Sequence, residues 1–180
     1  IELYKKIINI PGDILEFGVY KGSSFMRLLY LRELYENTFS REIIGFDIFG
    51  KFPNNVKEES DKEFISDFEY NGGFGISKDE LQKHINNLNL SNYSLIEGDI
   101  METLPKWVNN NKEERYSLVH VDVDVYEPTK LILENIWDKI IKGGVLVLDD
   151  FNSVYGETKA VEEFFKSNRI KHNIFKDKFS

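Results

Sequence analysis

The stretch that decides the fold is Ser117–Phe151, SLVHVDVDVYEPTKLILENIWDKIIKGGVLVLDDF. It starts with one apolar run and ends with another, GGVLVLDDF. Between them, apolar side chains recur at helical spacing, which predicts a helix from Thr129 to Ile141. Strand, helix and strand form a βαβ unit, in which the strands run parallel and their carboxyl ends share one edge of the sheet.

Acidic residues close both apolar runs. Asp122 and Asp124 end the first run, and Asp149 and Asp150 end the second. If the two strands are neighbours, about 5 Å apart, these carboxylates gather at one edge. Like charges that close repel each other, so a carboxyl group takes up a proton unless a cation lies among them. The stretch therefore predicts a carboxylate cluster suited to a cation.

The rest of the chain alternates strands with helices. We expect helices at 1–10, 24–36, 77–88, 104–110 and 157–167, a helix or lid at 56–70, and strands at 13–19, 41–48, 94–98 and 170–175. Ser23 or Ser24 is the expected cap of the second helix. This alternation predicts an α/β fold with a doubly wound, mostly parallel sheet of the Rossmann-like type, in a single domain over residues 1–180.

Composition excludes several classes of protein. The net charge of −8 argues against a nucleic-acid partner, and no apolar run approaches the length of about 20 residues that a membrane span needs. The chain has no cysteine, which excludes disulfides, thiolate catalysis and zinc-thiolate sites, and fits a cytoplasmic location. Because the first residue is Ile1 rather than Met, we expect further residues before it. Whether the chain forms a homo-oligomer stays open.

The first predicted strand ends in Glu16–Gly22, EFGVYKG, an E-x-G-x-x-x-G pattern. Gly18 permits a sharp turn, and Gly22 lets the next helix begin against a ligand with free N–H groups. The alternative is a plain strand-to-helix turn. The spacing differs from the dinucleotide fingerprint G-x-G-x-x-G, which argues against a dehydrogenase.

Two further strand ends carry acids. Asp47 ends the second strand, where an acid commonly accepts hydrogen bonds from a ribose diol. Asp99 follows the third strand and is placed to meet an adenine amino group. Each is alternatively a helix cap or an exposed loop acid. Together with the first strand end, they predict an adenosine-type ligand.

These motifs, above all D-x-D-x-Y-E-x-T followed by GG-x-x-x-x-DD, resemble those of class I S-adenosylmethionine methyltransferases. Within that class the chain is similar to the macrocin O-methyltransferase type, which methylates sugar hydroxyls with the help of a metal ion. The resemblance runs from Pro11 to about Phe165. The family continues into a C-terminal β-hairpin, for which residues 168–180 supply at most one strand, and its N-terminal substrate-covering elements are largely absent. The chain is therefore either shortened or part of a longer molecule.

The resemblance implies a role for each motif residue. The methionine part of the cofactor would be bordered by Glu16, Gly18 and Gly22. Tyr20, Ser23 and Asp122 would also contact the cofactor. Asp47 would hold the ribose and Asp99 the adenine. Mg²⁺ or another hard divalent cation would be held by Asp122, Asp149 and Asp150. Asp122 or Asp124 would be the catalytic proton acceptor. His120, inside the strand before Asp122, is predicted to be a core histidine.

The sequence thus predicts an O-methyltransferase that uses S-adenosylmethionine and a divalent metal, and acts on a sugar hydroxyl of a nucleotide-linked sugar or a glycoside. One alternative is a small-molecule O-methyltransferase of the catechol type, for which a flat pocket with aromatic walls is expected. The other is a catalytically silent subunit that binds S-adenosylmethionine.

Overall fold

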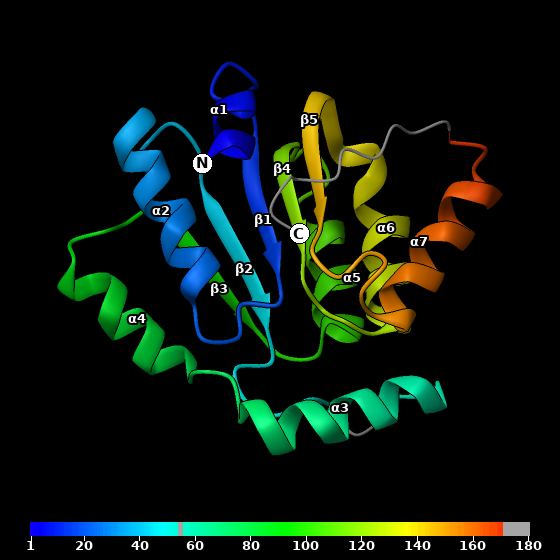
Figure 1. Ribbon diagram of the computed structural model, residues 1–180. Helices are drawn as coiled ribbons and strands as arrows, with labels where there is room; N and C mark the ends of the chain where they lie inside the picture. The colour runs from blue at the N-terminus through cyan, green and yellow to red at the C-terminus, as the bar shows by residue number, and fades with distance from the viewer. Residues whose placement is uncertain (54–55, 171–180) are drawn as a thin grey trace.

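A computed structural model describes residues 1–53 and 56–170. Its centre is a parallel five-stranded sheet in the order β3-β2-β1-β4-β5 (Figure 1). The strands are β1 (Asp13–Phe17), β2 (Ile43–Asp47), β3 (Tyr93–Glu97), β4 (Tyr116–Val121) and β5 (Ile140–Leu148). The prediction of a doubly wound parallel sheet is confirmed. The predicted strand at 170–175 falls almost entirely outside the described residues.

The helices cover both faces of the sheet, because successive residues of each strand point to opposite sides. Their bounds are α1 (Glu2–Ile7), α2 (Ser23–Tyr35), α3 (Glu59–Gly72), α4 (Lys78–Asn87), α5 (Ile100–Asn110), α6 (Tyr126–Ile136), η1 (Trp137–Lys139) and α7 (Tyr155–Ser167). On β1, Ile14 packs in one core cluster with α1, α2 and α4, while Leu15 packs in a second cluster with α5 and α6. Helix α7 packs outside α6 through a third, smaller cluster. Figure 1 shows α3 lying across the sheet edge where the strands end.

The deciding stretch folds as a βαβ unit, but its helix is shorter than predicted. Helix α6 begins at Tyr126 and ends at Ile136, a 3₁₀ turn follows, and β5 begins at Ile140. The pair Gly143-Gly144 lies inside β5, where a Cβ on Gly144 would come within 2.9 Å of the Ser117 carbonyl oxygen. The apolar residues before it fit helical spacing and strand burial equally well, so periodicity alone set the boundary too late.

Two helix starts also differ from the prediction. Helix α2 is preceded by Gly22 in the left-handed region, with no side-chain cap, so the predicted Ser23 or Ser24 cap is wrong. Helix α5 starts earlier, at Ile100, because Asp99 caps it. Ser77 caps α4, since its hydroxyl oxygen accepts a hydrogen bond from the Glu80 N–H.

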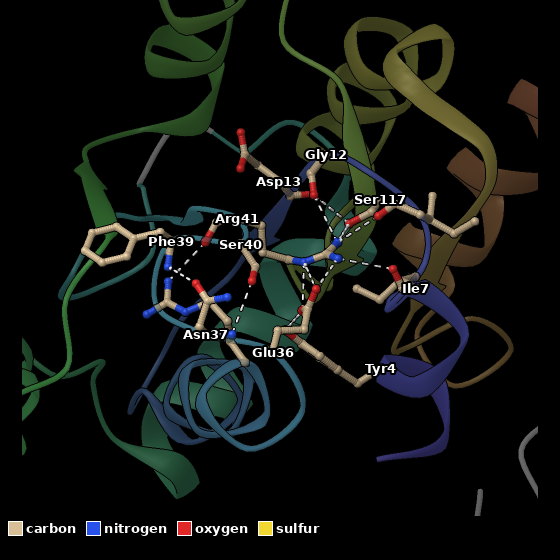
Figure 2. Close-up of polar contacts among 12 residues, drawn as sticks. Tyr4, Ile7, Gly12, Asp13, Glu36, Asn37, Phe39, Ser40, Arg41 and Ser117 are labelled. Carbon is tan, nitrogen blue, oxygen red and sulfur yellow. Dashed lines mark hydrogen bonds and ion pairs between the residues drawn. The ribbon is translucent and has the colours of Figure 1, made fainter.

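At the amino-terminal edge of the sheet, Arg41 is buried and joins several elements (Figure 2). Its guanidinium pairs with Glu36 at 2.6 Å and donates to the carbonyl oxygens of Ile7 and Gly12. It also donates to the Ser117 hydroxyl, at the start of the deciding stretch. One side chain therefore fixes the ends of α1, α2, β1 and β4 together.

Candidate functional site

A cavity of about 480 Å³ opens at the carboxyl ends of the strands. The chain runs from β1 outward to β2 and β3, then returns to β4 and β5, so the strand order reverses between β1 and β4. Ligands of doubly wound sheets bind outside the strand ends at such a reversal. Predicted site residues that line the cavity come from every strand end: Gly18, Tyr20, Asp47, Asp99, Asp122, Asp124 and Asp150.

Glycine at position 18 is required by close packing. Its φ is +88°, and a Cβ built there would lie 1.7 Å from the carbonyl oxygen of Asp122. The loops after β1 and β4 therefore touch. Gly22 precedes α2, and its missing side chain also makes room for Leu81 of α4. Gly22 and Ser23 are not among the described residues that line the cavity.

Asp47 shapes the loop that follows β1. Its carboxylate accepts hydrogen bonds from the backbone N–H groups of Val19 at 2.6 Å, Tyr20 at 2.8 Å and Phe49 at 2.6 Å. A carboxylate offers about four lone-pair sites, so one acceptor position is left for a ligand. Asp99 both caps a helix and lines the cavity. Its carboxylate accepts a hydrogen bond from the Met101 N–H at the start of α5.

The four predicted acids after β4 and β5 do come together, in two overlapping groups. Asp122, Asp124 and Asp150 form one, with one ligand atom from each side chain within 4.8 Å of the others. Asp122 and Asp149 form the second group, together with His120. Strand register explains the proximity, since Val121 pairs with Leu148 immediately before the acids. Asp122 belongs to both groups and is therefore the centre of the cluster.

Burial and mutual repulsion raise the pKa of most of these acids. Burial and the carboxylates of Asp149 and Asp150 raise the pKa of Asp122 to about 7, against the opposing effect of His120. Burial and Asp150 raise the pKa of Asp124 as well. Burial, again with Asp150, raises the pKa of Glu157 to about 8. Asp149 is the exception, because its bond with His120 lowers its pKa.

Several carboxylate oxygens in this region are buried without a hydrogen-bond partner among the described residues: Glu16 Oε2, Glu127 Oε2, Asp150 Oδ2 and Glu157 Oε2. A buried carboxylate without a partner is costly. Oxygen donors at this density suit a hard divalent cation such as Mg²⁺ or Ca²⁺. The residues therefore fit a metal ion.

His120 is more than the predicted core residue. Its Nδ1 lies 3.1 Å from Glu16 Oε1, and its Nε2 lies 3.6 Å from Asp149 Oδ1. Although burial opposes the charge, the bonds with Asp149 and Glu16 raise the pKa of His120 to about 10. Glu16 is thus fully buried beside this histidine and is not among the described residues that line the cavity. The signal in the sequence was spacing: Asp122 comes two residues after His120, just beyond the end of β4, so extended backbone places both side chains on one face.

Helix α3 closes the cavity on the side away from the sheet. Phe52 and Phe68 line it there and pack edge to face, with ring centroids 5.7 Å apart. The buried carboxylate of Asp61, from α3, accepts a hydrogen bond from the Tyr126 N–H at 2.8 Å. Helix α3 is therefore bonded to the start of α6, next to the acidic cluster.

Known proteins with similar sequences are O-methyltransferases by name. The chain is 26% identical over 149 residues to 8-demethyl-8-(2,3-dimethoxy-alpha-L-rhamnosyl)-tetracenomycin-C 4'-O-methyltransferase of Streptomyces olivaceus, covering 79% of this chain and 54% of that protein. It is 25% identical over 173 residues to Mycinamicin III 3''-O-methyltransferase of Micromonospora griseorubida, covering 92% and 63%. The chain thus spans 54–63% of the length of these curated relatives.

Solved structures agree on the fold. The calicheamicin methyltransferase CalS11 superimposes with a TM-score of 0.82 at 28% identity, over 99% of this chain and 74% of that one. The O-methyltransferase NovP gives a TM-score of 0.81 at 22% identity, over 94% and 70%. Residues 4–178 match the family model described as Macrocin-O-methyltransferase (TylF), and the chain belongs to that family.

Proposed function

We propose that this chain is the catalytic domain of an O-methyltransferase that transfers the methyl group of S-adenosylmethionine to a sugar hydroxyl with the help of a divalent cation. The observation that carries the proposal is one cavity that joins the adenosine-type strand ends, Asp47 and Asp99, to the acidic cluster. One relative supports a sugar acceptor, because its name describes a methyltransferase of a rhamnosyl-bearing tetracenomycin.

In this proposal each end of the cavity binds one partner. Asp47 uses its remaining acceptor position for the ribose, and Asp99 faces the adenine. Asp122, Asp149 and Asp150 hold the cation. Because Asp149 pairs with His120 in the structure, its carboxylate, 57% exposed, would have to turn from His120 to the ion.

S-adenosylmethionine supplies an activated methyl group, and a bound divalent cation lowers the pKa of a coordinated hydroxyl. Asp124, once ionised beside the cation, would accept the proton of the acceptor hydroxyl, and bound S-adenosylmethionine would supply the methyl group. Burial and Asp150 raise the pKa of Asp124, so its ionised carboxylate would be a stronger base than an exposed one. The apolar wall of Phe52 and Phe68 keeps water away from the transferring methyl group.

Removing the cation tests this function directly. Turnover of nucleotide-linked and glycosidic deoxysugars is expected to stop with EDTA and return with Mg²⁺, while S-adenosylhomocysteine binding, measured by calorimetry, stays within about threefold. Asp149→Ala is expected to reproduce the EDTA effect, because it removes one ligand and leaves the adenosine end untouched. Turnover that is insensitive to EDTA would overturn the metal role.

The aromatic wall also keeps the catechol-type alternative open to test. Tyr20, Phe52 and Phe68 line the cavity, and aromatic walls suit a flat acceptor. A catechol belongs in the same acceptor panel, and its methylation in preference to every sugar would replace the sugar proposal. Cofactor binding without turnover of any acceptor would instead indicate the silent subunit.

A further inference from the structure

Glu157 lies in the first turn of α7 and bonds both loops that carry the acidic cluster. Its backbone N–H donates to the carbonyl oxygen of Asp124 at 3.1 Å. Its side-chain Oε1 accepts from the backbone N–H of Asp150, also at 3.1 Å. Strands β4 and β5 pair as far as Val121 and Leu148. Beyond that pair, Glu157 spans the two loops with one bond to each.

The approach of α7 to these loops is close and depends on the preceding residue. A Cβ on Gly156 would lie 2.4 Å from Asp61 Oδ1 and 2.8 Å from the Tyr126 nitrogen. Residue 156 therefore has to be glycine for the first turn of α7 to come this near. Glu157 itself is fully buried, with no exposed surface. Its bonds to Asp124 and Asp150 are therefore shielded from solvent.

A carboxylate at this place is costly for the fold. Oε2 of Glu157 is buried without a hydrogen-bond partner among the described residues, beside the acids of both loops. An apolar side chain of similar size is often as good or better for stability at such a position. The presence of glutamate therefore indicates a role in function. Its two bonds identify that role as the spacing of Asp124 and Asp150.

We propose that Glu157 is a positioning residue, which holds the loops after β4 and β5 at the separation that lets their carboxylates share one cation. This inference rests on the proposed function, because it assumes a cation at the cluster. Residues that orient metal ligands typically change metal affinity by about 10–100-fold when they are replaced. Glu157 acts through the backbone of Asp124 and Asp150, so its geometry matters more than its charge.

Two conservative variants separate geometry from charge. Glu157→Gln keeps the Oε1 acceptor and removes the charge. Glu157→Asp keeps the charge and withdraws the carboxylate by about 1.5 Å, one carbon–carbon bond, from the Asp150 N–H. Glu162→Gln is the matched control, because Glu162 is exposed on the same helix. Binding of Mn²⁺ alone is measured by electron paramagnetic resonance, and binding of S-adenosylhomocysteine by calorimetry.

Positioning predicts that Glu157→Asp weakens Mn²⁺ binding by about tenfold or more, while Glu157→Gln binds at least about tenfold more tightly than Glu157→Asp. Glu162→Gln is expected to match the unchanged protein, and S-adenosylhomocysteine affinity to hold in every variant. Tighter Mn²⁺ binding by Glu157→Asp than by Glu157→Gln would overturn the inference. Equal Mn²⁺ affinity of both variants and the unchanged protein would overturn it as well. Should Glu157→Asp not fold, a loss of Mn²⁺ affinity of about tenfold in Glu157→Gln overturns it too. If the unchanged protein binds no Mn²⁺, the cation in the proposed function fails first, and this inference fails with it.

Discussion

At the scale of the residue, the turn after β1 and the acidic cluster after β4 meet at Gly18 and Asp122. The absent side chain of Gly18 leaves room for the Asp122 carbonyl oxygen, and the Asp122 N–H donates to the Phe17 carbonyl oxygen at 2.8 Å. The turn after β1 and the acid after β4 are therefore fixed to each other by backbone contacts. A change in one displaces the other.

Gly18→Ala is expected to destabilise the chain strongly, because a methyl group would overlap the Asp122 carbonyl and the backbone is left-handed. We expect a loss of at least about 3 kcal/mol, since clash and strain add, and thus a fall in melting temperature of at least about 6 °C. Differential scanning calorimetry measures this. Gly50→Ala is the control, because nothing lies within 4 Å of a Cβ there. An equal effect of the two substitutions would contradict the packing argument.

The sequence predicted the position of a residue well where that position depends only on the end of one strand. Asp47 and Asp99 were placed at one end of the site because each lies at the end of a strand, and both line the cavity. The surroundings of Glu16 and Gly22 were not foreseen, because they come from elsewhere in the fold, and the binding role of these two residues stays a prediction. Register sets His120 of β4 opposite Glu16, and Leu81 of α4 occupies the space beside Gly22. No pattern within one segment specifies such contacts.

At the scale of the element, α3 covers the cavity and is held by a few contacts. Val125 precedes α6 without a side-chain cap, and Asp61 of α3 supplies the missing acceptor from outside the helix. Lys159 of α7 adds an ion pair with Glu58 at 3.1 Å, just before α3 begins. The docking of α3 and the start of α6 are therefore coupled.

Asp61→Ala is expected to release α3, since it removes the acceptor for the Tyr126 N–H and costs about 1 kcal/mol, as for an N-cap. Hydrogen exchange followed by mass spectrometry is expected to show faster exchange in α3 and in the first turn of α6, with the sheet unchanged. Asp67→Ala, an exposed acid of the same helix, is the control. Slow exchange in α3 of the Asp61 variant would show that other contacts suffice.

The sequence predicted elements better than their ends. Residues 56–70 were interpreted as a helix or a lid, and α3 forms there, but its bond from Asp61 to Tyr126 joins positions 65 apart. The boundary between α6 and β5 was placed too late, because Ile140 satisfies both periodicities. Ile140 lies in β5 because it pairs with Tyr116 of β4, a contact that periodicity does not reveal.

At the scale of the whole molecule, buried charge determines how stability depends on pH. The pKa values of Asp122 and Glu157 are raised to about 7 and about 8, so the folded chain keeps protons that the unfolded chain has released. Their effect therefore favours folding at low pH and is lost as pH rises toward these values. His120, with its pKa raised to about 10, stabilises the fold fully below its ordinary value of 6.5 and loses that contribution as pH rises through about 10. All three groups act in the same direction.

Without a cation, the melting temperature is therefore expected to fall as pH rises from about 6 to about 9. Adding Mg²⁺ at about a hundred times its dissociation constant is expected to restore about 2.7 kcal/mol, or about 5–11 °C, because the ion takes the place of the protons. Thermal scans in EDTA and in Mg²⁺ measure both effects, with NaCl at equal ionic strength as the control. A melting temperature that no divalent cation raises at about pH 8 would contradict a metal site.

The membrane question has a plain structural answer. Among the described residues, none of the helices combines the length and apolar character needed to cross a membrane.

The buried Arg41 has a consequence for how this chain can diversify. It joins its partners at the amino-terminal ends of the strands, and five residues of extended strand, about 16 Å, separate it from the loops that line the cavity. Under the proposed function, substitutions that alter acceptor choice would fall at the opposite edge and leave this junction intact. The cavity loops could then change while the same scaffold is retained.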